Sequence, residues 1–249
     1  MPTLSHLNEM QVRYRLSRVR QLDNNRRSFL VVALAKEGIG TIFLSVLMAV
    51  ILTMGALSTG FIHIEVLAVL GWIAVFFFIY FFRDPQRSIP EGKNLILSPA
   101  DGRVVEIKEV METDFLNSRA TRIGIFMSPL DVHINRIPIT GRVTHFRYQK
   151  GKFRAAYTDQ AAIENEQTII GIEAENCKVL FKQIAGVLAR RIVCRIREGY
   201  EVRQGEKFGM IKFGSRVDIF LTEQVELKVK LKQRVRAGES IIGVLKDDW

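Results

Sequence analysis

The chain has 249 residues, of which 48% are hydrophobic, and it carries a formal net charge of +10. This length suffices for one sizeable folded domain with an attached segment. No helix-turn-helix pattern, zinc-finger spacing or aromatic-studded basic stripe accompanies the charge, which argues against a nucleic-acid partner and favours an anionic membrane.

The first segment, residues 1–37, is basic, with seven Lys or Arg against three Asp or Glu. Val12, Leu16 and Val19 recur there at helical spacing, with arginines between them. This pattern predicts a basic helix that lies on the membrane surface. A solvated, charged tail is the alternative interpretation.

Residues 38–82 form an apolar tract of 45 residues with one formal charge, Glu65. One transmembrane helix needs about 20 apolar residues, so the tract predicts a transmembrane hairpin. We expect its arms at Ile39–Leu57 and Val66–Phe82. Lys and Arg flank both ends of the tract, which predicts a cell-membrane protein with both ends on the cytoplasmic side. The turn between the arms lacks Lys and Arg and is expected to consist of Ser58, Thr59, Gly60 and His63.

Residues 83–249 consist of short apolar runs separated by turn residues, which predicts a mainly β (α+β) domain with sandwich- or barrel-like sheets. Ala185–Arg191 is either a short helix or more strand. The two cysteines, Cys177 and Cys194, show no CxxC spacing and are expected to be reduced. The predicted strands are Leu95–Leu97, Arg103–Lys108, Arg122–Phe126, Arg142–Tyr148, Thr168–Ile172, Lys178–Ile184, Ile192–Ile196, Val217–Leu221, Val225–Leu231 and Ile241–Leu245.

The residue types exclude several mechanisms. The four histidines fall at no metal-ligand spacing, and no HExxH, Walker loop or Rossmann glycine pattern is present, so neither a metal site nor a nucleotide site is expected. Three polar clusters interrupt the strands, at Ser98–Gly102, Ser128–Arg136 and Phe213–Ser215. Taken alone, these are a hairpin turn, a partly buried histidine at His133 and a turn dipeptide.

Taken together and in this order, the three clusters resemble the short-form phosphatidylserine decarboxylase family. They follow an apolar hairpin that ends in Phe81-Phe82-Arg83-Asp84-Pro85, and the resemblance covers most of the chain after residue 37. Its most specific part is the stretch around Ser215. The other matching stretches are Gly151–Phe153, Glu164–Glu166, Gly205–Asp218 and Val235–Gly243.

The resemblance implies that the peptide bond between Gly214 and Ser215 breaks spontaneously and that Ser215 becomes a pyruvoyl group. Two associated chains, residues 1–214 and 215–249, would result. The serine amine of the lipid would form a Schiff base with the pyruvoyl carbonyl, which takes up the electrons left behind by carbon dioxide. His133 would transfer protons, because an ordinary histidine exchanges them near neutral pH. Asp101 would orient or polarise groups during self-cleavage.

One position departs from the family's pattern. Longer members carry a second histidine three residues after the first, and this chain has Arg136 there. Arginine is a poor base at neutral pH, so Arg136 is expected to bind the phosphate or the carboxylate of the lipid. The sequence does not identify the group that acts as base in self-cleavage.

The expected function is therefore the pyruvoyl-dependent decarboxylation of phosphatidylserine to phosphatidylethanolamine in phospholipid biosynthesis. A decarboxylase of archaetidylserine-type ether lipids, which have the same headgroup, is one alternative. A non-catalytic, membrane-tethered adaptor is another, because Ala100–Val104 and Ala237–Ile241 resemble turns of biotinyl or lipoyl carrier domains. The adaptor would have no need of Phe213–Ser215. The sequence leaves the oligomeric state open, a homo-oligomer included.

Overall fold

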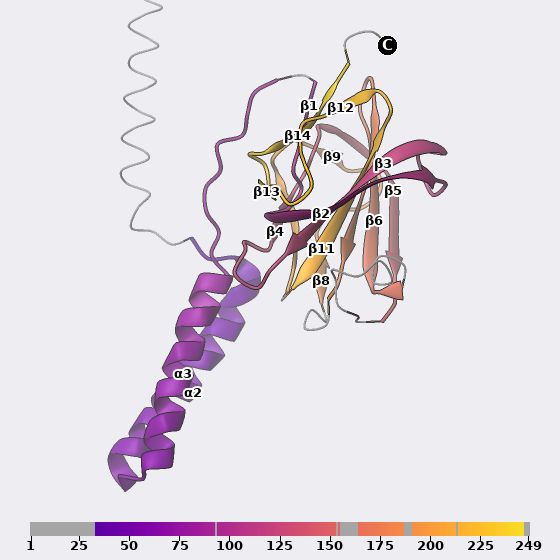
Figure 1. Ribbon diagram of the computed structural model, residues 1–249. Coiled ribbons are helices and arrows are strands. Elements are labelled where there is room, and N and C mark those ends of the chain that lie inside the picture. The colour runs from indigo at the N-terminus through magenta and orange to yellow at the C-terminus, as the bar shows by residue number, and fades with distance from the viewer. Residues whose placement is uncertain are drawn as a thin grey trace, which may run out of the picture.

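The structure is a computed structural model that describes residues 33–92, 94–152, 154, 164–186, 191–212 and 214–246. Residues 1–32, which hold most of the predicted surface helix, lie outside the described residues. The described chain consists of a helical hairpin followed by a β domain, and the hairpin projects away from the sheets (Figure 1). This agrees with the fold class expected from the sequence.

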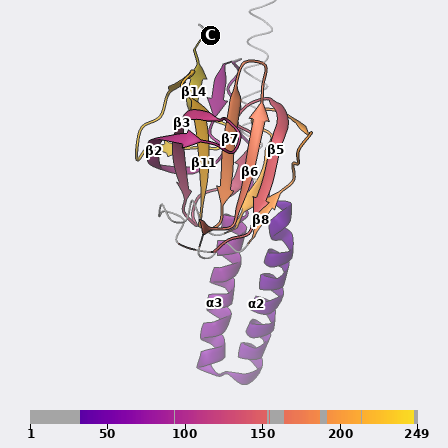
Figure 2. The ribbon, with the colours of Figure 1, turned by 90° about the vertical axis from the view of Figure 1, so that its right-hand side faces the viewer.

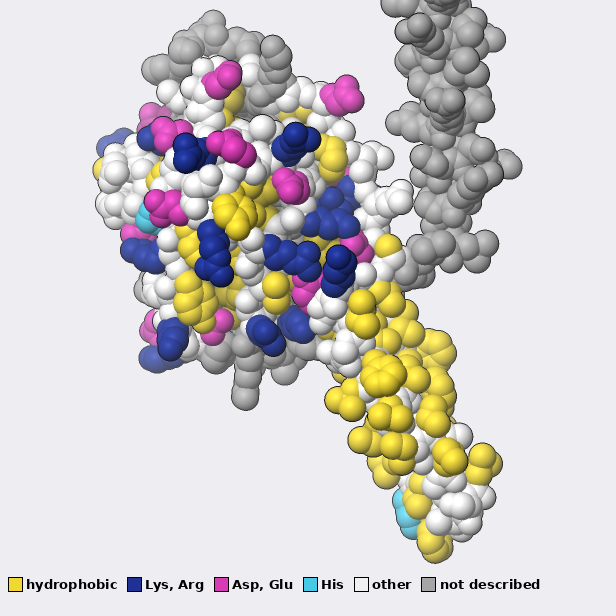
Figure 3. All heavy atoms as spheres, turned by 180° about the vertical axis from the view of Figure 1, so that it is seen from behind, with side chains coloured by type: hydrophobic (Ala, Val, Ile, Leu, Met, Phe, Trp, Pro, Cys, Tyr) yellow, Lys and Arg dark blue, Asp and Glu magenta, His cyan; other side chains and the backbone are white. Residues whose placement is uncertain are grey.

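Two apolar helices form the hairpin. A short 3-10 helix, η1 (Lys36–Gly38), leads into α2 (Ile39–Thr59), and α3 (Ile62–Phe81) returns to the β domain. Both helices are long and apolar enough to cross a membrane, and few of their residues are buried. Hydrophobic side chains cover the hairpin surface, whereas Lys and Arg gather on the β domain (Figure 3). These features suggest membrane association.

The reversal between the helices is tighter than predicted. Gly60 adopts a left-handed conformation with φ of 64° and ends α2, because glycine has no Cβ to clash there. The hydroxyl of Thr59 bonds to the carbonyl of Gly55 within α2, so the helix includes residues that we expected in the turn. The second arm starts at Ile62 rather than Val66, and His63 therefore lies in the first turn of α3.

Small residues allow the two helices to approach closely. Ala49 of α2 is fully buried, and a Cβ placed on Gly71 of α3 would lie 3.4 Å from the Ala49 Cβ. The indole N–H of Trp72 donates to the Thr53 hydroxyl across the pair, at 3.2 Å. Close backbone approach of this kind is typical of helices that associate in a membrane, where apolar burial by itself provides little driving force.

An eight-stranded antiparallel sheet, with the order β13-β2-β3-β11-β7-β6-β5-β9, curls into a half-barrel. Two three-stranded sheets, β1-β14-β12 and β4-β10-β8, accompany it. Figure 2 shows β11 between β3 and β7, with the hairpin below. The strands are β1 (Leu95–Leu97), β2 (Gly102–Glu112), β3 (Ser118–Met127), β4 (Ile134–Arg136), β5 (Gly141–Gln149), β6 (Gln167–Glu173), β7 (Lys178–Ile184), β8 (Ile192–Cys194), β9 (Glu201–Val202), β10 (Lys207–Ile211), β11 (Ser215–Thr222), β12 (Val225–Leu227), β13 (Arg234–Val235) and β14 (Ile241–Leu245).

Each predicted strand corresponds to an observed strand, but four observed strands were not predicted: β4, β9, β10 and β13. In β10, Gly209 lowers the strand propensity, yet a Cβ there would lie 2.2 Å from the carbonyl oxygen of Val193, so only glycine fits. The predicted strand Val225–Leu231 is shorter in the structure. It ends at Leu227, and the chain then passes through a turn at Lys232, whose φ is 67°, before it reaches β13.

A second hydrophobic cluster joins the hairpin to the β domain. The backbone N–H of Ala35 donates to the carbonyl of Phe82 at 2.8 Å, and that of Asp84 donates to Ala33 at 2.6 Å, so the two ends of the hairpin are clamped together. The cluster brings the last residues of α3 against the loop before β4 and against β10. Its buried members are Ala35, Phe81, Phe82, Val132, Ile134 and Met210.

Candidate active site

Ser215 is the first residue of β11 and is fully buried. It is paired with Met127, the last residue of β3, and its hydroxyl lies 3.4 Å from the Met127 sulfur. The preceding residue, Gly214, has a φ of 59°. This left-handed conformation favours glycine, so the Gly214–Ser215 bond is located where the backbone leaves an ordinary strand geometry.

Met127 and Asn135 connect the three polar clusters. The Asn135 amide lies 3.8 Å from the sulfur of Met127 and 3.4 Å from the carbonyl oxygen of Pro99. The Met127 sulfur in turn contacts the hydroxyl of Ser215. These contacts bring parts of the clusters at residues 98–102 and 128–136 close to Ser215. Phe213, the first residue of the third cluster, lies outside the described residues.

The side chain of Gln183, on β7, was not assigned a role from the sequence. It is fully buried, and its N–H donates to the Asn135 Oδ1 at 2.8 Å. This bond fixes the orientation of the Asn135 amide, so that its N–H points at Met127 and Pro99. A glutamine beside Ile184 in the strand-like run Lys178–Ile184 is the sequence signal that could have identified it, because buried amides normally need a partner.

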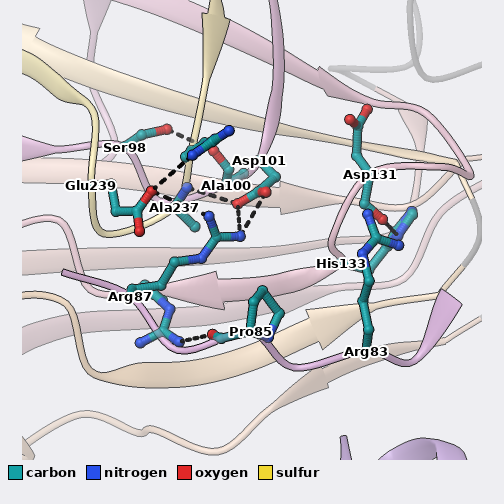
Figure 4. Close-up of polar contacts among 12 residues, drawn as sticks. Arg83, Pro85, Arg87, Ser98, Ala100, Asp101, Asp131, His133, Ala237 and Glu239 are labelled. Atoms are coloured by element: carbon teal, nitrogen blue, oxygen red, sulfur yellow. Dashed lines mark hydrogen bonds and ion pairs between the residues drawn. The ribbon is translucent and has the colours of Figure 1, made fainter. Parts of the chain in front are cut away.

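Asp101 lies directly before β2, and its carboxylate is held by two groups. Arg87 donates from Nη2 to both carboxylate oxygens, at 3.0 and 2.7 Å, and the Ala237 N–H donates to Oδ1 at 2.8 Å (Figure 4). Burial raises the pKa of Asp101 above its usual value, although Arg87 acts in the opposite direction. Glu239 binds the same arginine from the other side, at 3.4 Å.

The sheet register places Asp101 near the edge at which Ser215 begins. Arg103 pairs with Phe126, so Gly102 lies level with Met127, and Met127 pairs with Ser215. Neighbouring strands are about 4.8 Å apart, which puts the start of β2 about 10 Å from Ser215. No hydrogen bond joins the Asp101 carboxylate to His133 or Ser215 within the described part of the chain.

His133 lies in the loop before β4 and is fully buried. Its Nδ1 lies 2.9 Å from the Asp131 carbonyl oxygen, so Nδ1 carries the proton and donates it. Its Nε2 is buried and has no hydrogen-bond partner among the described residues. The ring packs against Phe81 at the end of α3, with 4.3 Å between centroids. Nε2 is therefore a free, buried base.

His133 does not have the ordinary pKa that we expected from the sequence. Burial lowers the pKa of His133 from 6.5 to about 4, and the positive charge of Arg83 adds to this effect. The imidazole is consequently neutral at physiological pH. In the intact chain it is able to accept a proton but has none to donate from Nε2.

Arg136 is buried between two backbone segments. Its guanidinium donates to the carbonyl oxygens of Gly205, at 2.9 Å, and Pro85, at 3.4 Å, and lies 3.9 Å from the Asp84 carboxylate. These contacts tie the segment after α3 to the turn before β10. They involve protein groups, and a direct contact of Arg136 with a lipid stays a prediction.

The comparisons with known proteins agree with one another. A family model described as phosphatidylserine decarboxylase matches residues 75–243. A phosphatidylserine decarboxylase proenzyme from Prosthecochloris aestuarii is 47% identical over 71% of this chain and 81% of its own length. Proteins of the same name from Chlorobium phaeobacteroides and Syntrophus aciditrophicus are 41% and 42% identical, over 86% and 75% of this chain and 100% and 88% of their own lengths.

The lowered pKa of His133 gives a testable pH dependence. Because its pKa in the folded chain is about 4 and the ordinary value is 6.5, the unfolded chain binds the proton first as the pH falls. The free energy of unfolding should therefore decrease from pH 6.5 to pH 4, by about 3 kcal/mol from this residue.

Histidine ring NMR measures the titration directly, and the His133→Gln variant identifies the signal. We expect the His133 signal to remain that of a neutral ring at pH 6. The difference in unfolding free energy between wild type and His133→Gln should decrease below pH 6.5. A titration midpoint near 6.5 would contradict the buried, unpartnered position of Nε2.

Proposed function

The chain belongs to the phosphatidylserine decarboxylase family, and on that premise we propose that Ser215 provides the group with which it decarboxylates phosphatidylserine. The observation that supports this proposal most is the position of Ser215, buried at the start of β11 behind a left-handed Gly214. The relatives are named proenzymes, which implies a precursor that is cleaved. Neither the ether-lipid nor the adaptor alternative is favoured by these relatives.

We place the self-cleavage between Gly214 and Ser215. The Ser215 hydroxyl attacks the Gly214 carbonyl carbon, which breaks the amide and forms an ester. Elimination then releases the Gly214 carboxylate and leaves dehydroalanine at residue 215, which water hydrolyses to a pyruvoyl group with loss of ammonia. The products are residues 1–214 and a chain that begins at residue 215 with the pyruvoyl group. A glycine before the serine leaves the carbonyl open to attack, because no side chain lies next to it.

The surroundings of Ser215 fit this group, which is built from the atoms of the serine itself and needs no larger space. Met127 presents a thioether to it, and the Asn135 N–H lies beyond the sulfur. The carbonyl of a pyruvoyl group supplies an electron sink for the loss of carbon dioxide from the amine-linked substrate.

His133 is proposed to move the proton. The amine of the lipid is an ammonium ion in water and must lose a proton before it can act as a nucleophile. The neutral Nε2 of His133 accepts that proton and later returns it to the carbon that has lost carbon dioxide. The Asp131 carbonyl supports both states, because Nδ1 donates to it throughout.

We propose that Asp101 and Arg136 support the reaction at residue 215, Asp101 in self-cleavage and Arg136 in substrate binding. Asp101 aligns groups during self-cleavage through the Pro99–Gly102 turn, which its bonds to Arg87 and Ala237 hold in place. Arg136 contributes to substrate binding by fixing the Asp84–Pro85 segment directly after the second apolar helix.

We further propose three functional regions with these limits: a basic segment at 1–37, a membrane hairpin at 38–82 and a catalytic domain at 83–249. Both ends of the hairpin face the cytoplasm, where the catalytic domain meets an anionic leaflet. The basic residues at both ends of the hairpin and their absence from the Gly60 turn support this orientation.

The first test of this proposal concerns Ser215→Ala. The change removes the nucleophile at nearly constant bulk, so folding and membrane binding should persist. Intact-mass measurement should find one chain in the variant and two chains in the wild type, divided after Gly214, and the variant should be inactive. Ser118→Ala, at the start of β3, serves as the control and should be cleaved normally. A variant that is still cleaved would refute the assignment.

The second test concerns His133→Ala. We expect self-cleavage to proceed and the turnover number to fall about 10²- to 10⁴-fold, which is the usual contribution of general acid-base catalysis. His145→Ala is the matched control and should retain turnover, because that histidine lies on β5 against Phe115. Wild-type turnover in His133→Ala would remove His133 from the mechanism, and a failure to cleave would reassign it to self-processing.

The third test concerns orientation. A cysteine introduced at Ser58, next to the Gly60 turn, should react with a membrane-impermeant maleimide only from the side opposite the catalytic domain. A cysteine at Ser88, beyond the hairpin, is the control and should react from the cytoplasmic side. Labelling of both positions from the cytoplasmic side would replace the spanning hairpin with a re-entrant one.

A further inference from the structure

Arg83 has no role in the reaction as derived so far, yet its position is distinctive. It follows Phe82, the C-cap of α3, and forms a β-bridge with Leu34 across the base of the hairpin. If α3 spans the bilayer, a residue at this end lies at the depth of the phosphate groups of the lipids. Arginine is well suited to such a depth, because its apolar stem tolerates the interface.

The guanidinium of Arg83 is held in place before any ligand arrives. Nη1 donates to the Tyr80 carbonyl at 2.8 Å, Nη2 donates to the Leu130 carbonyl at 2.7 Å, and the group stacks 3.9 Å from the centre of the Tyr80 ring. These bonds use two of its five N–H groups. Among the described residues no carboxylate forms an ion pair with it, so its charge is not neutralised within that part of the chain.

Arg83 also lies beside the proposed base. Its side chain runs toward the His133 imidazole, on the side away from the Asp131 carboxylate (Figure 4). Its positive charge is one of the causes that lower the pKa of His133, after burial. A ligand bound to Arg83 would therefore be within reach of Nε2.

Other cations near the base of the hairpin are less available. Arg136 donates to Gly205 and Pro85 and faces Asp84. Lys212 donates to the Glu37 carbonyl at 3.1 Å. Arg83 therefore combines a fixed geometry, spare donors and proximity to His133, a combination that Arg136 and Lys212 lack.

We propose that Arg83 binds the phosphodiester of the serine phospholipid, an inference that rests on the function proposed above. A fixed guanidinium fork matches two phosphate oxygens. The carboxylate is the less suitable ligand, because an ion pair would stabilise it in the ground state and its charge disappears as carbon dioxide leaves. Binding the phosphate instead holds the lipid at its membrane end and leaves the serine amine and carboxylate free to reach His133 and residue 215.

The test compares Arg83→Gln with wild type on two substrates presented in the same detergent micelles. One is phosphatidylserine, and the other is an O-alkyl serine, which has the amine and the carboxylate but no phosphate. For phosphatidylserine we expect KM to rise about 10- to 100-fold, which is the range for one charged hydrogen-bonding group, and kcat to change little. For O-alkyl serine the two proteins should have equal kcat/KM.

Matched variants separate binding from charge and from folding. Arg195→Gln removes a cation near the start of the hairpin, where it pairs with Glu37, and should leave both substrates unaffected. Arg83→Lys keeps the charge without the fork and should show a smaller rise in KM. If Arg83→Gln does not fold, Arg83→Lys provides the test of phosphate binding. A KM for phosphatidylserine equal to that of wild type would then refute phosphate binding by Arg83.

Each protein is first examined for two chains and for reaction with hydroxylamine. If the wild type shows neither, the proposed function fails, whatever Arg83 does. If Arg83→Gln has the wild-type chains and carbonyl but an unchanged KM, the phosphate site is refuted while the function stands. An equal loss of kcat/KM on both substrates would also refute the phosphate site and make Arg83 a positioning residue. A failure of Arg83→Gln alone to cleave would refute the phosphate site as well and make Arg83 a self-processing residue.

Discussion

The pairing of β11 on both of its edges is the constraint on which the rest of the structure depends. Ser215 to Thr222 pair with β3, and Arg216 to Phe220 pair with β7, so the strand that begins at the proposed cleavage site is central in its sheet. A cut before Ser215 would leave these ladders intact. The new end of the chain would remain where the uncut serine lies, beside Met127.

Buried charges reinforce that strand. Arg216 is almost wholly buried and pairs with Asp218 on its own strand and with Glu106 on β2. After cleavage, the contact between Arg216 and Glu106 would join the two chains. Removing one partner of a buried pair typically costs about 3–5 kcal/mol, so dissociation of the small chain would be opposed by electrostatics as well as by the sheet. The guanidinium lies over Gly124, where a Cβ would be 2.5 Å from Nη2, which accounts for glycine at that position.

Much of this arrangement could be predicted from the sequence, because hydrophobic periodicity and turn residues are local signals. The hairpin and the long strands were found in this way, and the resemblance to a family identified Gly214, Ser215, His133 and Asp101 as candidates. The pairing partners were not predictable, since register depends on contacts distant in sequence. The lowered pKa of His133 results chiefly from burial of its ring, against which Phe81 of the hairpin packs, and that contact is distant in sequence. Met127 and Gln183 carried only weak local signals.

The most direct measurement of the central claim is chemical trapping at residue 215. Wild-type protein is incubated with phosphatidylserine and cyanoborohydride, and the chains are separated and sequenced by mass spectrometry. We expect the lipid amine to become bonded to the first residue of a chain spanning residues 215–249, and we expect Ser215→Ala to trap no lipid. Lipid attached to a lysine, or an active wild-type chain still intact between Gly214 and Ser215, would contradict the central claim.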